Sequence, residues 1–415
     1  MLSVANPYTP NAGASPENVV GRDEHLEAFR ILLQRLSRGR TNQSMIITGL
    51  RGVGKTVLLT EFNEIAREGK WEVIELEANK HDESQFRRRM ASSMKASLLR
   101  LSPRKLWSEI GQRAAAAISA FAVSVDQAGT WSLSWDVEAA EGFADHGDLA
   151  MDLSDVLVAL GEAARERGRG VAILIDEIQF LSQPQLEAVI QAVHKTVQRA
   201  LPVTMVGAGL PQIAELAGDA RSYAERLFRF PKIDSLGPDD AKKAITDPAE
   251  AEGVTIQDDA VDLMLEITRG YPFFIQELGY QVWEISEASP ITREDVELAR
   301  DAYEAKLDES FFRVRLDRST PLQTAYMRAM AELGPEPQKA SEVARIMGRE
   351  STQLGPTRAE LIDMGLLYTP EHGYAAFTVP DFDKYMMRAV PQLVVPPVQQ
   401  RTRRSAARAQ QRSES

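Results

Sequence analysis

A glycine-rich octapeptide, GLRGVGKT at residues 49–56, is the clearest chemical pattern in the sequence. Such a loop can curl so that consecutive backbone N–H groups face a phosphate, and the positive end of a following helix adds to the attraction. Lys55 would reach the β- and γ-phosphates, and the Thr56 hydroxyl would ligate Mg²⁺. The pattern predicts a site for ATP and Mg²⁺. The expected contacts from the loop are Gly49, Arg51, Gly52, Val53, Gly54, Lys55, Thr56 and Val57.

An acidic pair can supply the other half of this site. In ILIDEIQ, at residues 173–179, Asp176 ends an apolar run that is typical of a buried strand. Its carboxylate can bind in the shell of Mg²⁺, and Glu177 is the natural base to polarise an attacking water. The alternative is that both residues only end the strand at the surface. With a phosphate loop in the same domain, the sequence favours the catalytic role.

The elements that must position these residues alternate along the chain. Short apolar runs predict strands, and stretches with apolar residues three and four positions apart predict helices between them. This alternation is typical of an α/β fold in which a parallel sheet carries helices on both faces. From Ser235 to about Leu307 only helical patterns follow. The expected strands cover residues 44–49, 71–78, 170–181, 201–209 and 228–233.

Composition excludes several kinds of site. The 415 residues contain no cysteine, so disulfides, thiolate catalysis and cysteine-ligated metals are excluded. The net charge of −12 argues against a surface that coats nucleic acid throughout. The most apolar run, residues 114–125, is shorter than the ~20 residues of a membrane span. Because the N-terminus also lacks the pattern of a secretory signal, we expect a cytoplasmic protein with no membrane partner.

Together these features resemble the AAA+ P-loop ATPases, in the branch that links initiator (origin-recognition) ATPases to STAND-type signalling ATPases. NVVGRDEHLEAF at residues 18–29 is similar to the VGR box of that group, which packs on adenine and ribose. GYPFFIQEL at residues 270–278 resembles the motif of its helical lid, in which Pro272 would lie against the nucleotide. The resemblance thus adds contacts to the nucleotide site from Val20, Gly21, Arg22 and Pro272.

Two further positions follow from the resemblance. YAERLF at residues 223–228 precedes the fifth strand, where oligomeric members place an arginine finger, and Arg226 is the candidate, with Arg221 second. A surface arginine in a salt bridge is the competing interpretation of Arg226. The fourth strand departs from the family because it ends in glycine, alanine and glycine at 207–209, where many members carry a polar sensor. Thr204 or a backbone group would have to substitute.

The resemblance implies a domain order. We expect an extended N-terminal arm, a P-loop NTPase domain with an insertion, a helical lid, a winged-helix domain and a disordered basic tail. The corresponding residues are 1–18, 19–234 with an insertion at about 80–150, 235–307, 316–390 and 391–415.

The insertion is expected to project from the sheet as a helix and a hairpin. Residues 121–137 alternate on both sides of a Gly-containing turn. The strands would carry Phe121, Val123, Val125, Trp131, Leu133 and Trp135, an apolar surface that either packs on the parent domain or meets a protein partner.

Two functions remain open at this stage. The first is an ATP-hydrolysing ATPase of initiator or loader type, which binds double-stranded DNA through its winged helix and basic tail and assembles in a nucleotide-dependent homo-oligomer. The second is a STAND-like nucleotide-controlled switch that hydrolyses slowly and regulates a protein partner. Residues 316–390 hold 8 basic and 10 acidic residues, which weakens the case for DNA. The tail adds Arg401, Arg403, Arg404, Arg408 and Arg412.

Overall fold

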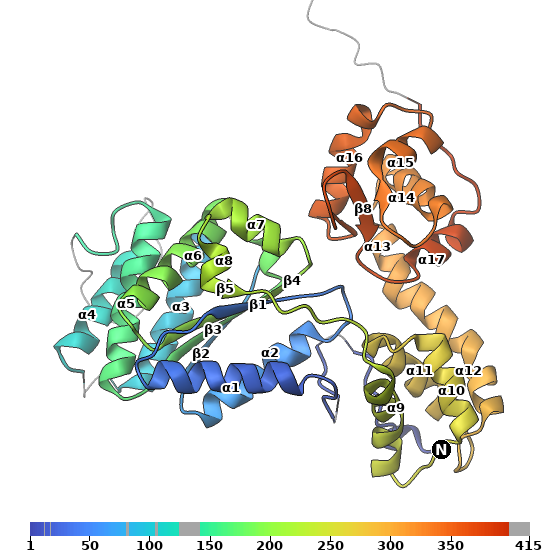
Figure 1. Ribbon diagram of the computed structural model, residues 1–415, viewed down its shortest axis with the longest axis horizontal. Helices are drawn as coiled ribbons and strands as arrows, with labels where there is room; N and C mark the ends of the chain where they lie inside the picture. The colour runs from blue at the N-terminus through green and yellow to red at the C-terminus, as the bar shows by residue number, and fades with distance from the viewer. Residues whose placement is uncertain (12, 17, 80–82, 104–106, 124–141, 398–415) are drawn as a thin grey trace, which may run out of the picture. The chain divides into compact units, whose positions relative to one another are not determined.

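A five-stranded sheet forms the centre of the N-terminal part of the chain in a computed structural model of the protein (Figure 1). The structure describes all residues except 12, 17, 80–82, 104–106, 124–141 and 398–415. The chain divides into two compact units, Met1–Leu307 and Asp308–Ser415. None of the described helices is long and apolar enough to cross a membrane.

The sheet is parallel throughout and has the strand order β2-β3-β4-β1-β5. Central parallel strands are covered on both faces, and β1 and β4 are buried at every position, whereas the edge strand β2 carries three glutamates and is partly exposed. The carboxyl ends of β1 and β3 therefore open on the same edge of the sheet. The strands are β1 (Ser44–Thr48), β2 (Glu72–Glu77), β3 (Val171–Asp176), β4 (Val203–Gly209) and β5 (Phe228–Arg229).

Helices cover the two faces of this sheet. On one face, α1 (Asp23–Ser37) packs on α2 (Lys55–Glu68), which contacts β2, β3 and β4. On the other face, α5 (Leu149–Glu166) and α6 (Gln183–Gln198) pack side by side (Figure 1). Two short helices follow β4, namely α7 (Ile213–Ala220) and α8 (Ala224–Leu227).

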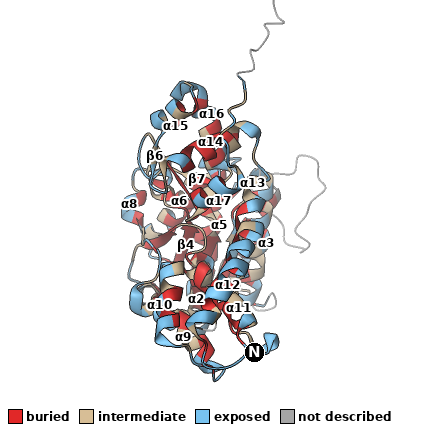
Figure 2. Ribbon diagram, turned by 90° about the vertical axis from the view of Figure 1, so that its right-hand side faces the viewer, coloured by how far each residue is buried: buried red, intermediate tan, exposed pale blue. Residues whose placement is uncertain are grey.

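The described part of the insertion does not project from the sheet, and the expectation that it would is wrong. Its helices α3 (Glu83–Leu101) and α4 (Glu109–Val123) pack on α5, and α3 also contacts β2. Their apolar side chains share one buried cluster with β3, β4, α5 and α6. In Figure 2, which colours the ribbon by burial, the region around β4 is largely buried. A buried ion pair joins the insertion to α5, because Arg87 Nη1 lies 2.8 Å from Asp152 Oδ2 with both side chains at most 2% exposed.

The expected hairpin is also corrected where it can be compared. Phe121 and Val123 belong to α4, and the Phe121 side chain is fully buried. The run of alanines before them explains the difference, because alanine has the highest helix propensity and the run extends the helix. Val125, Trp131, Leu133 and Trp135 lie outside the described residues.

Four helices follow β5 in the segment expected to form the lid, and we use that name for them. They are α9 (Pro238–Ala251), α10 (Asp258–Thr268), α11 (Pro272–Ile285) and α12 (Arg293–Lys306). The N-terminal residues lie along α11. Asn6 Nδ2 donates to the Tyr280 carbonyl at 3.2 Å, and the buried Tyr8 hydroxyl donates to the Ile245 carbonyl. A Cβ on Gly279 would lie 2.5 Å from the Tyr8 ring, so this glycine is what lets the ring enter the lid.

The C-terminal unit combines the four helices α14–α17 with a small antiparallel sheet of order β6-β8-β7. A π-helical turn, Leu307–Arg313, and the short α13 (Val314–Leu316) lead into it. Phe312, Phe382 and Tyr385 pack together in its core. The other elements are α14 (Pro321–Leu333), β6 (Gln338–Lys339), α15 (Ala340–Ile346), α16 (Ser351–Asp363), β7 (Leu367–Tyr368), β8 (Tyr374–Phe377) and α17 (Phe382–Ala389).

Candidate nucleotide site

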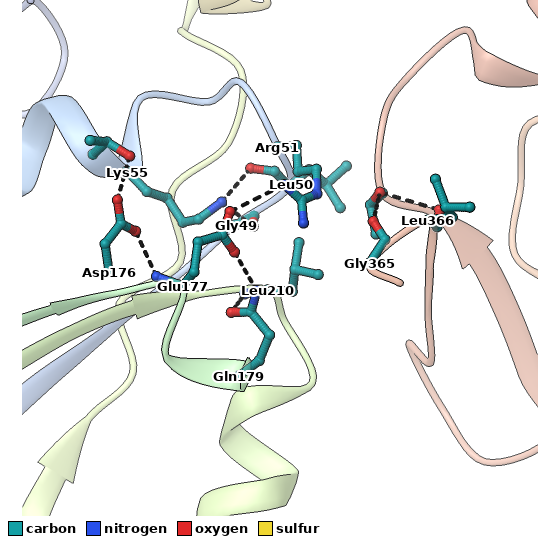
Figure 3. A network of polar contacts seen from close by, with 12 residues as sticks. Gly49, Leu50, Arg51, Lys55, Asp176, Glu177, Gln179, Leu210, Gly365 and Leu366 are labelled. Atoms are coloured by element: carbon teal, nitrogen blue, oxygen red, sulfur yellow. Dashed lines mark hydrogen bonds and ion pairs between the residues drawn. The ribbon is translucent and has the colours of Figure 1, made fainter. Parts of the chain in front are cut away.

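The phosphate loop connects β1 to α2 at the carboxyl edge of the sheet. Gly52 and Gly54 have φ of +85° and +91°, conformations that favour glycine, so the loop curls as the sequence predicts. Lys55 begins α2, and its ammonium group donates to the Gly49 and Leu50 carbonyls at 3.0 and 2.7 Å (Figure 3). Burial lowers the pKa of Lys55 to about 8, although Glu177 and Asp176 act in the opposite direction.

Thr56 and Asp176 lie together, as a magnesium site requires. The Thr56 hydroxyl donates to Asp176 Oδ2 at 2.6 Å, which joins the start of α2 to the end of β3. No group of three or more histidine, aspartate or glutamate side chains that could hold a metal occurs among the described residues. The hydroxyl and carboxylate of this pair fit Mg²⁺, because proteins usually bind Mg²⁺ through one or two side chains, water and the phosphates of a substrate. A hard cation there would neutralise charge on the phosphates.

Glu177 is held in an unusual backbone conformation beside the loop. Its φ is +50°, which is uncommon for a residue with a side chain. Its amide donates to Asp176 Oδ1 at 2.8 Å, and its carboxylate accepts from Arg51 Nη1 at 3.2 Å and from Gln179 Nε2 (Figure 3). Both side chains of the Arg51–Glu177 pair are 23% exposed, so solvent reaches them. A carboxylate oriented in this way can polarise a water beside the loop.

Arg22 ties the VGR segment to the loop. The Arg22 guanidinium donates to the carbonyls of Val53, at 3.1 Å, and Asp234, at 2.8 Å. Burial lowers the pKa of Arg22, although the nearby carboxylates of Asp234 and Asp240 act in the opposite direction. Gly21 has φ of +67°, and a Cβ there would lie 2.7 Å from Asp240 Oδ2. The half-buried Val20 precedes them. This segment therefore lies between the phosphate loop and the start of the lid.

The lid contacts the phosphate loop on both sides of Pro272, the first residue of α11. The Tyr271 hydroxyl donates to the Arg51 carbonyl, and the Phe273 amide donates to the Gly52 carbonyl at 3.2 Å. A Cβ on Gly52 would lie 3.1 Å from Phe273 Cβ. Tyr271 and Phe273 were not expected from the sequence, although both flank Pro272 in GYPFFIQEL.

Arg226 lies at the opposite edge of the sheet. It is exposed at the end of α8, just before β5, and β5 begins beside Ser44, the first residue of β1. The structure therefore does not bring Arg226 to the nucleotide site of its own chain. Arg221, the second candidate, donates to Gln191 Oε1 at 3.0 Å and lies 3.8 Å from Glu187.

Thr204 cannot replace a polar sensor at the end of β4. It pairs with Ala172 near the start of the strand, is fully buried, and lies 3.0 Å from Ser44 Oγ at the amino edge. The polar side chain beside the end of β4 is instead that of Gln179, which the sequence analysis did not identify. Its position within ILIDEIQ, two residues after Glu177, was the available signal.

Comparisons with known proteins agree with this geometry. The AAA ATPase domain family matches residues 18–206, and a domain of unknown function, DUF8462, matches residues 309–386. No curated protein matches the chain.

The solved structures that are similar include the Walker-type ATPase PABY2304 of Pyrococcus abyssi, with 14% identity, 90% of this chain and 97% of that chain covered, and a TM-score of 0.53. At this identity the likeness concerns the fold alone. The Thermotoga maritima RuvB Holliday junction branch migration motor follows with 16% identity, coverages of 92% and 98%, and a TM-score of 0.46. The Aeropyrum pernix Orc1 protein in complex with DNA has 15% identity, coverages of 90% and 94%, and a TM-score of 0.44.

The matched range holds the VGR segment, the phosphate loop and the acidic pair that follows β3. Residues 18–206, just under half of the chain, match the AAA ATPase domain family, and this match identifies the chain as an ATP hydrolase of the P-loop class.

Proposed function

We propose that the chain hydrolyses ATP with Glu177 as the base and uses the reaction to control its lid. The observation that carries this proposal is the convergence of the base and the lid on Arg51. The Arg51 side chain pairs with Glu177, while the Arg51 carbonyl accepts from Tyr271 of the lid. A triphosphate in the loop competes with Glu177 for the Arg51 guanidinium. Movement of Arg51 toward the phosphates also shifts its carbonyl, which accepts from Tyr271, so nucleotide binding, release of Glu177 and the lid contact change together.

Each residue then has a defined part in hydrolysis. Lys55, at the start of α2, binds the β- and γ-phosphates once it exchanges the loop carbonyls for phosphate oxygens. Thr56 and Asp176 would hold Mg²⁺, which would neutralise charge on the phosphates. Glu177 accepts a hydrogen bond from the attacking water and takes its proton as the bond to the γ-phosphorus forms. The bond between that phosphorus and the oxygen bridging to the β-phosphate breaks, and ADP leaves. The VGR residues contact the nucleotide from the side of α1, and Pro272 contacts it from the side of the lid.

The decisive experiment compares wild-type chain with Glu177→Gln and Lys55→Ala. We expect Glu177→Gln to keep nucleotide binding and lose turnover by ~10²–10⁴, the usual contribution of a general base. Lys55→Ala should lose binding itself, because it lacks the phosphate contact. Phosphate release and binding of a fluorescent ATP analogue give the two measurements. Full turnover in Glu177→Gln would contradict the assignment.

The charges of the C-terminal unit favour a protein target, as in a nucleotide-controlled switch. Five of the ten basic side chains in the described part of this unit form ion pairs within it. A basic side chain that is already paired adds little to the neutralisation of DNA phosphates. The exposed residues at the start of α16, 351–353, carry no charge that could pair with a DNA phosphate. The pairs are Arg313–Asp317, Arg328–Glu332, Arg345–Glu342, Lys384–Asp381 and Arg388–Asp308.

One observation keeps double-stranded DNA as a second candidate target. The segment after α17 folds back on the unit, since Arg328 Nε donates to the Val390 carbonyl at 2.6 Å and Arg349 donates to the Pro396 carbonyl. Arg349 lies two residues before the start of α16, so Pro396, two residues before the arginine-rich sequence 398–415, lies near the start of this helix. If the unit is a winged helix that reads DNA through α16, these arginines would join its contact with the backbone.

A binding measurement separates the two targets. Random duplex DNA is titrated at low and moderate salt, with and without ATP, against the full chain and a chain that ends at residue 397. The DNA candidate requires binding that weakens steeply with salt and is lost on truncation. The switch requires no such binding and an ATP-dependent protein contact instead.

A further inference from the structure

The end of β4 lacks side chains where the turn after β3 lies against it. The 3₁₀ turn Ile178–Phe180 follows Glu177 directly. A Cβ on Gly207 would lie 2.7 Å from Ile178 Cδ1, and a Cβ on Gly209 would lie 2.6 Å from Gln179 Oε1. Real Cβ atoms do not approach other atoms so closely. The two glycines therefore leave the space that this turn needs, and the Gln179 amide occupies the space beside Gly209.

The Gln179 amide bridges the end of β4 and the base. Its oxygen accepts from the Leu210 amide at 3.1 Å, and its nitrogen donates to Glu177 Oε2 (Figure 3). Because a backbone N–H faces one side and a carboxylate faces the other, both ends of the amide are fixed in orientation. The end of β4 is in turn bonded to the phosphate loop, since the Gly49 amide donates to the Gly209 carbonyl at 3.2 Å.

We propose that Gln179 is a positioning residue for Glu177, and that it supplies from the turn after β3 the polar group that β4 lacks. Arg51 contacts Oε1 of the carboxylate, whereas Gln179 contacts Oε2. When phosphate draws Arg51 away, Gln179 remains and keeps the carboxylate aimed at the loop. This inference rests on the proposed role of Glu177 as the base.

The first test is Gln179→Ala. Loss of the donor leaves the carboxylate free to rotate, so we expect kcat to fall roughly 10–100-fold, the usual effect of removing a residue that orients a catalytic group. The KM for ATP and the Kd of a fluorescent ATP analogue should stay within about twofold, because an interaction needed only in the transition state affects kcat. Gln183→Ala is the matched control, since Gln183 is exposed on α6 and donates to Glu187.

A rescue pair separates positioning from simple packing. Gly209→Asn alone should also lose turnover, because its side chain would displace the Gln179 amide. Combined with Gln179→Ala, the same asparagine can occupy the vacated space and present its own amide from β4. We expect kcat of the double variant to exceed that of either single variant, a coupling that independent sites do not show.

Two results would overturn the proposal. One is a kcat of Gln179→Ala within about twofold of wild type. The other is a parallel fall of kcat, nucleotide affinity and melting temperature in Gln179→Ala, with no recovery in the double variant, which would make the role structural. Glu177→Gln, measured in the same assays, distinguishes failure of the positioning role of Gln179 from failure of the role of Glu177 as the base. If it is inactive while Gln179→Ala is normal, only the positioning role fails; if it is fully active, the role of the base fails as well.

Discussion

Nucleotide affinity should fall as pH rises through about 8, because burial lowers the pKa of Lys55 to that value. With this pKa, roughly nine tenths of the lysines are charged at pH 7 and roughly one tenth at pH 9. Only the charged form binds phosphate well, so apparent Kd varies inversely with that fraction. If the phosphates hold Lys55 charged in the complex, ATP should bind about tenfold more weakly at pH 9 than at pH 7.

The sign follows from proton linkage. The pKa of Lys55 is low in the free protein and higher beside the phosphates, so binding takes up a proton, and raising the pH opposes it. Titration calorimetry in two buffers of different ionisation enthalpy should show an uptake that grows to about 0.9 proton per ATP at pH 9.

A charge that does not titrate provides the control. Lys55→Arg stays protonated throughout this range, so its affinity should be independent of pH even if it is weaker. Wild-type affinity that is constant between pH 7 and 9, or an equal decline in Lys55→Arg, would refute the reasoning.

Two further perturbations test an assembly and the insertion. If Arg226 acts as a finger on a neighbouring subunit, activity per subunit should rise with protein concentration and fall by up to ~10³–10⁵ in Arg226→Ala but not in Arg229→Ala; activity that is constant on dilution would exclude this. Asp152→Asn should destabilise the N-terminal unit by about 3–5 kcal/mol, measured by urea unfolding, because it removes the buried carboxylate that pairs with Arg87 and leaves only the exposed Glu83 as its charge partner. Replacing both, as Arg87→Met with Asp152→Leu, should recover most of that loss, and a single variant as stable as wild type would show that the pair is dispensable.

The nucleotide half of the site could be predicted because its chemistry is local. A loop that binds phosphate with its own N–H groups needs consecutive residues, and glycine marks the positions where φ is positive. Asp176 and Glu177 were recognised for a related reason, since the end of an apolar strand opens at the same edge as the loop in a parallel sheet. The α/β class followed from the alternation of strands and helices.

Contacts between distant segments carried weaker signals. Thr204 was considered as a substitute sensor because it is the polar residue of its strand, but the register pairs it with Ala172 at the amino edge of the sheet. Phe121 and Val123 fitted a strand by alternation alone, although the alanines before them continue α4. A short apolar run does not distinguish a strand from a buried helix until its neighbours are known.

The sequence by itself therefore determined the phosphate loop and the acidic pair, because each depends on residues within one turn or strand of one another. It also determined the fold class, because strands and helices each leave a local pattern and their order along the chain can be read from those patterns. Only the tertiary structure placed Tyr271 against Arg51 and Gln179 between Glu177 and Gly209. Those contacts join residues on different elements, and whether they form depends on the register of strands and on space left by a missing side chain. The sequence shows only that the end of β4 has no polar side chain. The fold shows that the Gln179 side chain occupies the space this leaves.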